Sequence, residues 1–174
     1  MTRILPVIIF AGGAGKRFNA DKAAVLTPAL AQAVHGHGLP VIISGREIAG
    51  YITVADHPRA GLGPLGGLCG GLRYARDQGF AEALSLPCDM WPFSLAIIDA
   101  LQGAPCAVAA QNHLIGRWPT ALAGELEAFL KCGQDRSMRA WSKHIAARRI
   151  DLAVPIRNIN TQAEWLTIED PRLP

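Results

Sequence analysis

The feature that most constrains the fold of this chain is an apolar run, Ile4 to Phe10, that ends in a glycine-rich turn. The run has the length and composition of a buried strand, and the stretch that begins with its last residue reads FAGGAGKRFNADK. Glycines in such a turn allow several backbone N–H groups to converge on one anion. Basic side chains follow at Lys16, Arg17 and Lys22. The pattern favours a phosphate-binding loop over the plainer alternative, an ordinary strand-to-helix connection on a basic surface.

Two familiar phosphate motifs do not fit this turn. A P-loop needs Ser or Thr after its Gly-Lys pair, and here Arg17 stands in that place. A dinucleotide fingerprint that starts at Gly13 needs glycine where the chain has Phe18. The segment Gly61 to Gly66, GLGPLG, has the GxGxxG spelling with a proline inside it, and we interpret it as a loop that leads into a glycine-rich helix.

Apolar runs of strand length alternate with helix-like segments along the whole chain. This alternation predicts an α/β protein whose mostly parallel sheet is covered on both faces. The predicted strands are Ile4–Phe10, Pro40–Ser44, Tyr51–Val54, Ala83–Pro87, Cys106–Ala110 and Ile150–Ala153.

Capping residues and glycines predict where the helices begin and end. One helix is expected to start at Thr27-Pro28 and to end at Gly36, and Thr161 with Glu164 forms a capping box for the last helix. Further helices are predicted over Leu65–Gln78, Glu125–Cys132 and Ser137–Ala147. The second helix contains Gly66, Gly67, Gly70 and Gly71. These glycines either let the helix pack tightly on the sheet or leave room for a flat base.

In an open parallel sheet, ligands bind at the carboxyl ends of the strands. The loop from Ala11 to Asp21, the stretch from Ser44 to Arg46, Asp56 and Asp89 all follow predicted strands. Asp89 is the strongest catalytic candidate, because one carboxylate there is enough to hold Mg²⁺, which keeps water and phosphate oxygens as its other ligands. The alternative for Asp89 is a cap on the helix after Trp91-Pro92, and the alternative for Asp56 is a simple turn.

Several short motifs occur in the order found in one known family. They are Ala11-Gly12-Gly13, Arg17, Asp21-Lys22, Asp56, Pro64 to Gly67, Pro87-Cys88-Asp89, Trp118-Pro119-Thr120, Gly133 to Met138 and Asn158 to Thr161. In this series the chain resembles the nucleotidyltransferases that activate sugars and cofactors, especially molybdenum cofactor guanylyltransferase. The resemblance implies a three-layer α/β/α Rossmann-like nucleotidyltransferase fold, with residues 1–174 as a single domain.

The resemblance also implies a reaction, the transfer of GMP from GTP to molybdopterin with Mg²⁺ held at Asp89. It gives catalytic roles to Arg17, Lys22 and Asp89. Nucleotide binding falls to Phe10, Ala11, Gly12, Gly13, Lys22, Ser44, Asp56 and Asp89. Binding of the acceptor falls to Arg136, Asn158 and Asn160, and molybdoenzymes or their chaperones are the expected protein partners. A solvated basic face is the alternative for Arg136, and a capped turn is the alternative for the two asparagines.

The chain departs from the family pattern at three places. Phe18-Asn19 replaces the usual Met and small residue, the segment after Lys22 lacks the customary Gly-Lys-Pro-Leu stretch, and Ser44 stands where Asn is usual. Two other functions therefore stay open: a related nucleotidyltransferase that uses CTP or another phosphorylated acceptor, and a non-catalytic nucleotide-binding module.

Composition limits the partners and the compartment. A net charge of +3 over 174 residues suits a small anionic ligand and is too weak for nucleic acid. The 4 cysteines are far apart, which predicts a reduced, cytoplasmic protein, and no apolar run is long enough for a membrane span. Met1 to Gly15 imitates a signal peptide, but Pro6 interrupts its short core. The scattered histidines do not predict a zinc site, and no pattern indicates covalent catalysis.

Overall fold

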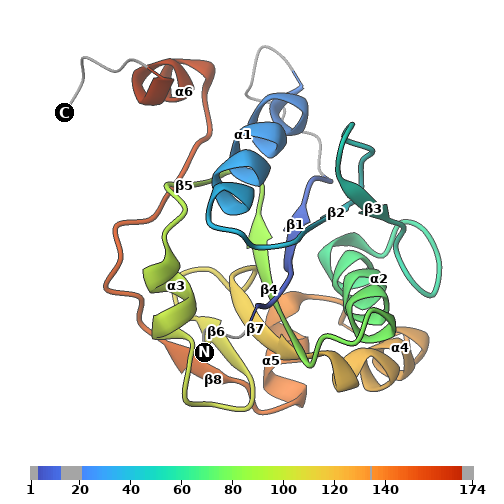
Figure 1. The fold of residues 1–174 in the computed structure, drawn as a ribbon. Helices are drawn as coiled ribbons and strands as arrows, with labels where there is room; N and C mark the ends of the chain where they lie inside the picture. Colours follow the sequence, from blue (N-terminus) through green and yellow to red (C-terminus); the bar gives the residue numbers. More distant parts are fainter. Residues whose placement is uncertain (1–3, 13–20, 134, 170–174) are drawn as a thin grey trace.

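The computed structural model of the protein describes residues 4–12, 21–133 and 135–169. In these residues one large sheet has the strand order β3-β2-β1-β4-β7-β6-β8 (Figure 1). Its strands are β1 (Val7–Phe10), β2 (Val41–Ser44), β3 (Ile52–Val54), β4 (Glu82–Pro87), β6 (Ala107–Ala109), β7 (Gly116–Pro119) and β8 (Arg148–Ile150). β7 runs antiparallel to β4 and β6, and the other neighbouring pairs are parallel. The prediction of a mostly parallel sheet is confirmed.

Helices cover both faces of this sheet (Figure 1). They are α1 (Lys22–Gly36), α2 (Gly63–Asp77), α3 (Leu95–Ala100), α4 (Ala123–Lys131), α5 (Met138–His144) and α6 (Gln162–Glu169), with a 3-10 turn at Thr120–Leu122. Residues of α1 and α3 share one apolar core with the sheet, and residues of α2, α4 and α5 share the other. α6 packs beside α1 through a small third cluster that contains Trp165 and Leu26.

The central strand β1 shows why the sheet needs both helical layers. Val7 and Ile9 belong to the core on the α1 side, and Ile8 and Phe10 belong to the core on the α2 side. All four side chains are buried, as is usual for a parallel strand covered on both faces. Because helices cover β1 on both faces, its end lies in the middle of the molecule.

Two short strands lie outside the large sheet. β5 (Met90–Trp91) pairs antiparallel with β9 (Arg157–Asn158). We call this pair the β5–β9 ribbon. It brings the chain near residue 158 beside the end of β4, although the two segments are far apart in the sequence.

The predicted start of the first helix, Thr27-Pro28, is wrong. α1 begins at Lys22, and Asp21 caps it by accepting a hydrogen bond from the Ala24 N–H. Pro28 lies inside the helix, where it lacks the N–H that would otherwise extend the ladder. The sequence signal misled because proline favours a first helical turn, whereas here Asp21 supplies the cap earlier.

The helix predicted at Ser137–Ala147 ends earlier than expected, and the last predicted strand also differs from the prediction. α5 ends at His144, and Ala146 takes a left-handed conformation with φ of 50°. A glycine usually occupies such a position and predicts the end of a helix, but none stands here. The strand predicted at Ile150–Ala153 is instead Arg148–Ile150, an exposed edge strand with two arginines. The short β5, β7 and β9 were not among the predicted elements, and α3 is the helix after Trp91-Pro92 that the capping alternative for Asp89 assumed. Other boundaries agree within a few residues, and the loop-then-helix interpretation of Gly61 to Gly66 is confirmed.

The glycines of α2 serve close packing. A Cβ on Gly67 would lie 2.1 Å from Ser44 Oγ, and one on Gly70 would lie 2.1 Å from the Ala55 carbonyl oxygen. Gly66 and Gly71 are similarly crowded, by Asp56 and Leu62 and by Ile8. The first of the two alternatives for these glycines, tight packing of the helix on the sheet, is therefore the one the structure shows.

None of the helices in the three described ranges combines the length and the apolar content that a bilayer crossing requires.

Candidate functional site

The ends of three parallel strands meet at the carboxyl edge of the sheet. Phe10 stands in register with Ser44 on one side and with Pro87 on the other. The Ala11 N–H donates to the Ser44 carbonyl at 2.8 Å, and the Cys88 N–H donates to the Phe10 carbonyl at 3.2 Å. The ends of β1, β2 and β4 thus lie side by side, as predicted.

Gly12 and Gly45 bring two of these loops into close approach. Gly45 has φ of +89°, and a Cβ there would lie 3.0 Å from the Gly12 backbone nitrogen. Glycine is required at position 45 on both counts. The backbone at Gly12 thus lies directly against the loop after β2. Gly13 and Arg17, both predicted site residues, lie outside the described residues.

A three-residue polar cluster stands at the same edge. Lys22 Nζ donates to Asp89 Oδ2 at 2.8 Å and to Asn160 Oδ1 at 3.3 Å. The side chains of Lys22 and Asp89 are 14% and 24% exposed. The structure therefore unites residues predicted from three separate motifs, at positions 22, 89 and 160.

Local structure fixes each member of this cluster. Lys22 is the first residue of α1, so its position depends on the Asp21 cap, whose carboxylate also accepts from Arg46. Asp89 follows β4 and is tied to the β5–β9 ribbon, because its carbonyl accepts from the Ile159 N–H at 2.8 Å. The helix after Trp91-Pro92 is capped by Ser94, so the capping alternative for Asp89 is excluded.

The capping box at the start of α6 holds Asn160. Glu164 Oε2 accepts from the N–H groups of Asn160 and Thr161, and Thr161 Oγ1 accepts from the Glu164 N–H. These backbone hydrogen bonds lower the pKa of the Glu164 carboxyl. Asn160 Nδ2 donates to the Asn158 carbonyl, which leaves Oδ1 facing Lys22. The predicted capping box is confirmed, and it also orients a site residue.

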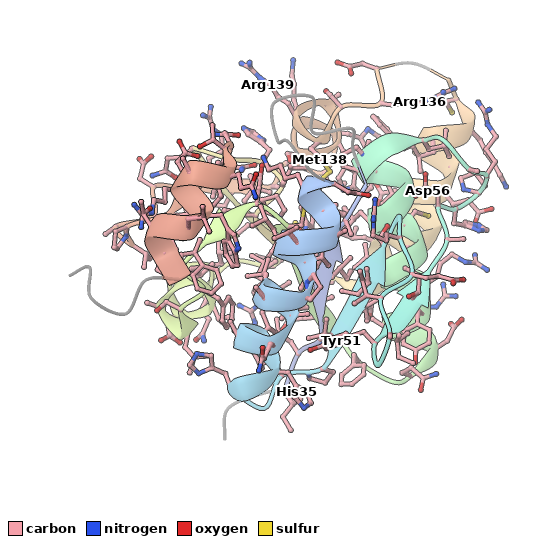
Figure 2. The ribbon with its side chains drawn as sticks, turned by 90° about the horizontal axis from the view of Figure 1, so that it is seen from above. His35, Tyr51, Asp56, Arg136, Met138 and Arg139 are labelled. Carbon is pink, nitrogen blue, oxygen red and sulfur yellow. The ribbon has the colours of Figure 1, made fainter. Side chains whose placement is uncertain are left out.

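Asp56 follows the edge strand β3, which β2 and β1 separate from β4 and Asp89. Its Oδ2 accepts from the Leu62 N–H at 3.2 Å, next to the start of α2. Three strand spacings separate β3 from β4, which amounts to on the order of 14 Å. That span fits a nucleotide better than one metal ion shared by Asp56 and Asp89. Figure 2 labels Asp56 on the side of α2.

The cluster offers a suitable donor set for a divalent cation. Asp89 Oδ2 and Asn160 Oδ1 converge on one positive centre, the Lys22 ammonium. Carboxylate and amide oxygens are hard ligands of the kind that Mg²⁺ prefers. In the described part of the chain, no three His, Cys, Asp or Glu side chains gather as a larger metal cage. A cation here would depend on substrate oxygens for the rest of its shell.

A cavity of about 340 Å³ opens beside the two asparagines. Its lining combines apolar side chains with neutral amides, namely Ala109, Gln111, Asn112, Ile115, Leu152, Val154, Ile156, Asn158 and Asn160. A larger hollow of about 980 Å³ lies at the amino ends of the strands and includes none of the predicted site residues. The smaller cavity is therefore the one associated with the site.

Gln111 holds one wall of the smaller cavity in place. Its side-chain amide donates to the Leu152 carbonyl and accepts from the Leu152 N–H, both at 3.3 Å. One side chain thus satisfies both backbone polar groups of Leu152, which lies in the irregular stretch between β8 and β9. Sequence reasoning missed Gln111 and Asn112, because a single glutamine after a strand carries no distinctive spacing.

Arg136 does not join the asparagines. It is exposed just before α5, whose buried residues belong to the core on the α2 side. Within the described ranges Arg136 makes no hydrogen bond or ion pair, and Figure 2 shows Arg136 and Arg139 reaching outward at the rim. The structure thus brings together Asn158 and Asn160 and leaves Arg136 apart from them.

Other motif residues have structural roles. Trp118 is fully buried, its Nε1–H donates to Ser85 Oγ, and Thr120 Oγ1 donates to the Phe80 carbonyl. Burial raises the pKa of the Cys69 thiol to about 11 and that of Cys106 to about 12. Such thiols stay protonated near neutral pH and are poor nucleophiles.

Solved structures share this architecture. A protein of Aquifex aeolicus superposes with a TM-score of 0.71 at 19% identity, covering 91% of this chain and 95% of that one. A structure described as mannose-1-phosphate geranyltransferase from Thermus thermophilus gives 0.63 at 13% identity, over 91% and 77% of the two chains. Together with the strand order, these neighbours define the class of fold: a three-layer α/β/α Rossmann-like fold.

Sequence comparison narrows the class. The profile described as "MobA-like NTP transferase domain" matches residues 7–150. A molybdenum cofactor guanylyltransferase of Acidiphilium cryptum is 34% identical over 92% of this chain and 91% of its own length. One of Sinorhizobium fredii is 28% identical over 95% and 94%. The chain belongs to the family of MobA-like NTP transferase domains, so it is a nucleotidyltransferase, and the family resemblance found in the sequence is confirmed.

Proposed function

We propose that this enzyme transfers GMP from GTP to molybdopterin and releases pyrophosphate. The relatives named molybdenum cofactor guanylyltransferase support this substrate pair. The observation that carries the proposal is the contact of Lys22 with both Asp89 and Asn160 at the glycine-rich end of β1. This contact joins a phosphate-binding end of the sheet to the edge of the 340 Å³ cavity.

The reaction is an in-line displacement at the α-phosphorus of GTP. An oxygen of the terminal phosphate of molybdopterin forms the new bond to that phosphorus. The bond from the α-phosphorus to the bridging oxygen breaks, and its electron pair leaves with pyrophosphate. The attacking oxygen is already anionic, so no general base is needed.

The chain's own residues stabilise the charge that develops on pyrophosphate. In this proposal the backbone at Ala11 and Gly12 would bind phosphate oxygens, and the Lys22 ammonium would stabilise the departing group. The sequence motif assigns the same tasks to Gly13 and Arg17, which lie outside the described residues. Fixed positive groups aimed at developing charge are worth far more in a partly enclosed site than in water. Ser44 and Phe10, which are buried beside this strand end, would support the nucleotide.

Nucleotidyltransferases generally use a divalent metal, and Mg²⁺ is the ion that this donor set fits. Asp89 would hold it, with Asn160 as a neighbouring oxygen donor. When bound, the ion supplies charge neutralisation between phosphate oxygens. Lys22, which neutralises Asp89 in this structure, would then be released to contact the phosphates.

The two substrates meet from opposite sides. Asp56 would accept hydrogen bonds from the N1–H and amino group of guanine, since an ionised carboxylate is an acceptor only. Asn158 and Asn160, at the edge of the apolar cavity, would bind the acceptor, with Arg136 as a more distant basic contact. An apolar cavity with several neutral amides suits a flat, hydrogen-bonding pterin ring.

The setting proposed for this activity is the cytoplasm, with molybdoenzymes or their chaperones as recipients of the product. The four cysteines, at positions 69, 88, 106 and 132, are all free thiols, which supports a reducing compartment. We further propose that residues 1–174 act as one domain.

The test is pyrophosphate release with molybdopterin, Mg²⁺ and either GTP, CTP or ATP. We expect turnover with GTP and a loss of about a hundredfold or more in Asp89→Asn. Asp99→Asn, an exposed position on α3, serves as the matched control and should keep full activity. A preference for CTP would instead favour the related nucleotidyltransferase, and binding without turnover would favour the non-catalytic module.

A further inference from the structure

The loop that presents Asp56 is attached to two helices. This loop, residues 55–62, joins β3 to α2. The His57 N–H donates to the Gly66 carbonyl at 3.0 Å, and the Leu62 N–H donates to Asp56 Oδ2 at 3.2 Å. The first hydrogen bond fixes the loop to the first turn of α2, and the second closes the loop on its own last residue, Leu62, which is the N-cap of α2. A third attachment comes from α4.

That third attachment is Glu127. Its Oε2 lies 3.0 Å from His57 Nε2 and 3.0 Å from Arg73 Nη1, while Oε1 lies 2.6 Å from Lys131 Nζ. One carboxylate of α4 therefore connects the residue after Asp56 with a residue of α2. The contact is half-buried, with His57 and Glu127 side chains 30% and 21% exposed.

The charges around Glu127 keep it ionised. The Lys131 ammonium and the His57 imidazole, both beside this carboxylate, lower the pKa of the Glu127 carboxyl from 4.5 to about 2. The Arg73 guanidinium on α2 contacts the same oxygen, Oε2, that faces His57. An ionised carboxylate therefore faces His57 Nε2 at 3.0 Å.

A second glutamate on α4 provides a comparison. Glu125 Oε1 lies 3.2 Å from His144 Nε2, and both side chains are about half exposed, 52% and 46%. That pair joins α4 to α5 only. The two glutamate–histidine contacts of α4 thus differ in one respect that matters for function: His57 directly follows the residue proposed to read the base.

We propose that Glu127 is a positioning residue for guanine recognition, which holds the 55–62 loop through His57 so that Asp56 meets the base at a fixed place. The inference rests on the proposed function, in which Asp56 contacts guanine. Discrimination between bases depends on polar groups placed to within a fraction of an ångström, because a displaced acceptor no longer penalises the wrong base. Glu127 itself touches no substrate.

The experiment compares GTP with inosine triphosphate, which lacks the 2-amino group of guanine, in the full-length enzyme with Mg²⁺ and molybdopterin. The wild type should favour GTP in kcat/KM by about tenfold or more, since a hydrogen bond to a charged group is lost with inosine. In Glu127→Gln this ratio should fall to within about threefold of unity, mainly through a higher KM for GTP, with kcat nearly unchanged.

Two pairs of variants separate positioning from general destabilisation. His57→Phe breaks the same connection while leaving Glu127 with Arg73 and Lys131, and it should lose the same discrimination. Glu125→Gln and His144→Phe are the matched controls, and they should keep the wild-type ratio. Adding Glu127→Gln to Asp56→Asn should lower the ratio no further than Asp56→Asn alone, because both changes act on one contact.

Four results would overturn the inference. Equal weakening of GTP and inosine triphosphate in Glu127→Gln would show a purely structural role. An unchanged ratio in His57→Phe would remove the link through the loop. A wild type that does not distinguish the two nucleotides, or an Asp56→Asn variant with the wild-type ratio, would reject the role proposed for Asp56 itself, and with it this inference.

Discussion

Lys22 has two partners of different kinds, the carboxylate of Asp89 and the amide oxygen of Asn160. Ion pairs that are partly open to water contribute little to folding, typically about 0–1 kcal/mol. A lysine at the start of a helix is also placed against the helix dipole, whose positive end disfavours it. The position of this residue is therefore better explained by chemistry at the site than by stability.

A first prediction concerns Lys22→Met, which keeps the length of the side chain and removes its charge. We expect kcat to fall by about a hundredfold or more, as when one group that stabilises a developing oxyanion is removed. The thermal midpoint should change little, because the pair contributes little stability. Steady-state kinetics and thermal unfolding of the same preparation check both parts.

Lys143→Met is the matched control for this prediction. Lys143 is exposed in the last turn of α5. The control should match the wild type in both measurements. Similar losses of activity in the two variants, or a full-activity Lys22→Met, would rule out the role assigned to Lys22.

The site residues that sequence predicted best are those that follow strands. Asp89 could be placed at the mouth of the sheet because β4 is continuous, apolar and buried. Gln111 could not be placed in this way, because its role is to form two hydrogen bonds with the backbone of Leu152, which is distant in the sequence. Contacts between a side chain and a remote backbone leave no periodic pattern.

At the scale of elements, the packing of α2 on the sheet gives a sharp prediction. A Cβ on Gly67 would lie 2.1 Å from Ser44 Oγ and 3.1 Å from Ser44 Cβ, both buried. We expect Gly67→Ala to destabilise the protein by about 1–3 kcal/mol, as overpacking does. Adding Ser44→Ala removes the nearest atom and should restore part of the loss, which chemical denaturation of the four variants would show.

Gly124 on α4 is the opposite case. A Cβ there would meet nothing within 4 Å. Gly124→Ala should therefore stabilise the protein by about 0.5–1 kcal/mol through helix propensity alone. If both glycine variants changed stability in the same direction, the packing explanation for Gly67 would fail.

Elements differ in how far their own sequence specifies them. The parallel strands β1, β2 and β4 were predictable because burial on both faces makes them uniformly apolar. β7 and β9 were not, since they are short and contain arginine, and their partners lie far along the chain. The start of α1 was missed because Asp21 was considered only as part of a functional motif, although it also serves as a helix cap.

At the scale of the whole molecule, the carboxyl and thiol groups with shifted pKa values predict a loss of stability below about pH 5 and above about pH 9. The pKa values of Asp21, Glu127 and Glu164 are lowered in the folded protein, mainly by hydrogen bonds to their carboxylates. As the pH falls, the unfolded chain therefore binds protons at a higher pH than the folded protein does, so the free energy of unfolding decreases. Burial raises the pKa of Cys69 and Cys106 from 9.0 to about 11 and 12, so stability also falls above about pH 9.

Glu127→Gln should change the acid side of this profile. The difference in unfolding free energy from the wild type should be largest near neutral pH and shrink as the pH falls from 4.5 toward about 2, where the wild-type carboxyl becomes protonated. Urea titrations at a series of pH values measure it. A difference that stays constant across that range would contradict the lowered pKa of Glu127.

The β5–β9 ribbon ties the last part of the chain to the end of β4. The family profile ends at residue 150, and β9 and Asn160 come after it. The ribbon returns this later segment to the sheet, where Asn160 Oδ1 accepts a hydrogen bond from Lys22. Because that hydrogen bond links the segment to the proposed phosphate site, we expect a chimaera that takes residues 151–160 from a relative to change its use of nucleotide and of acceptor together.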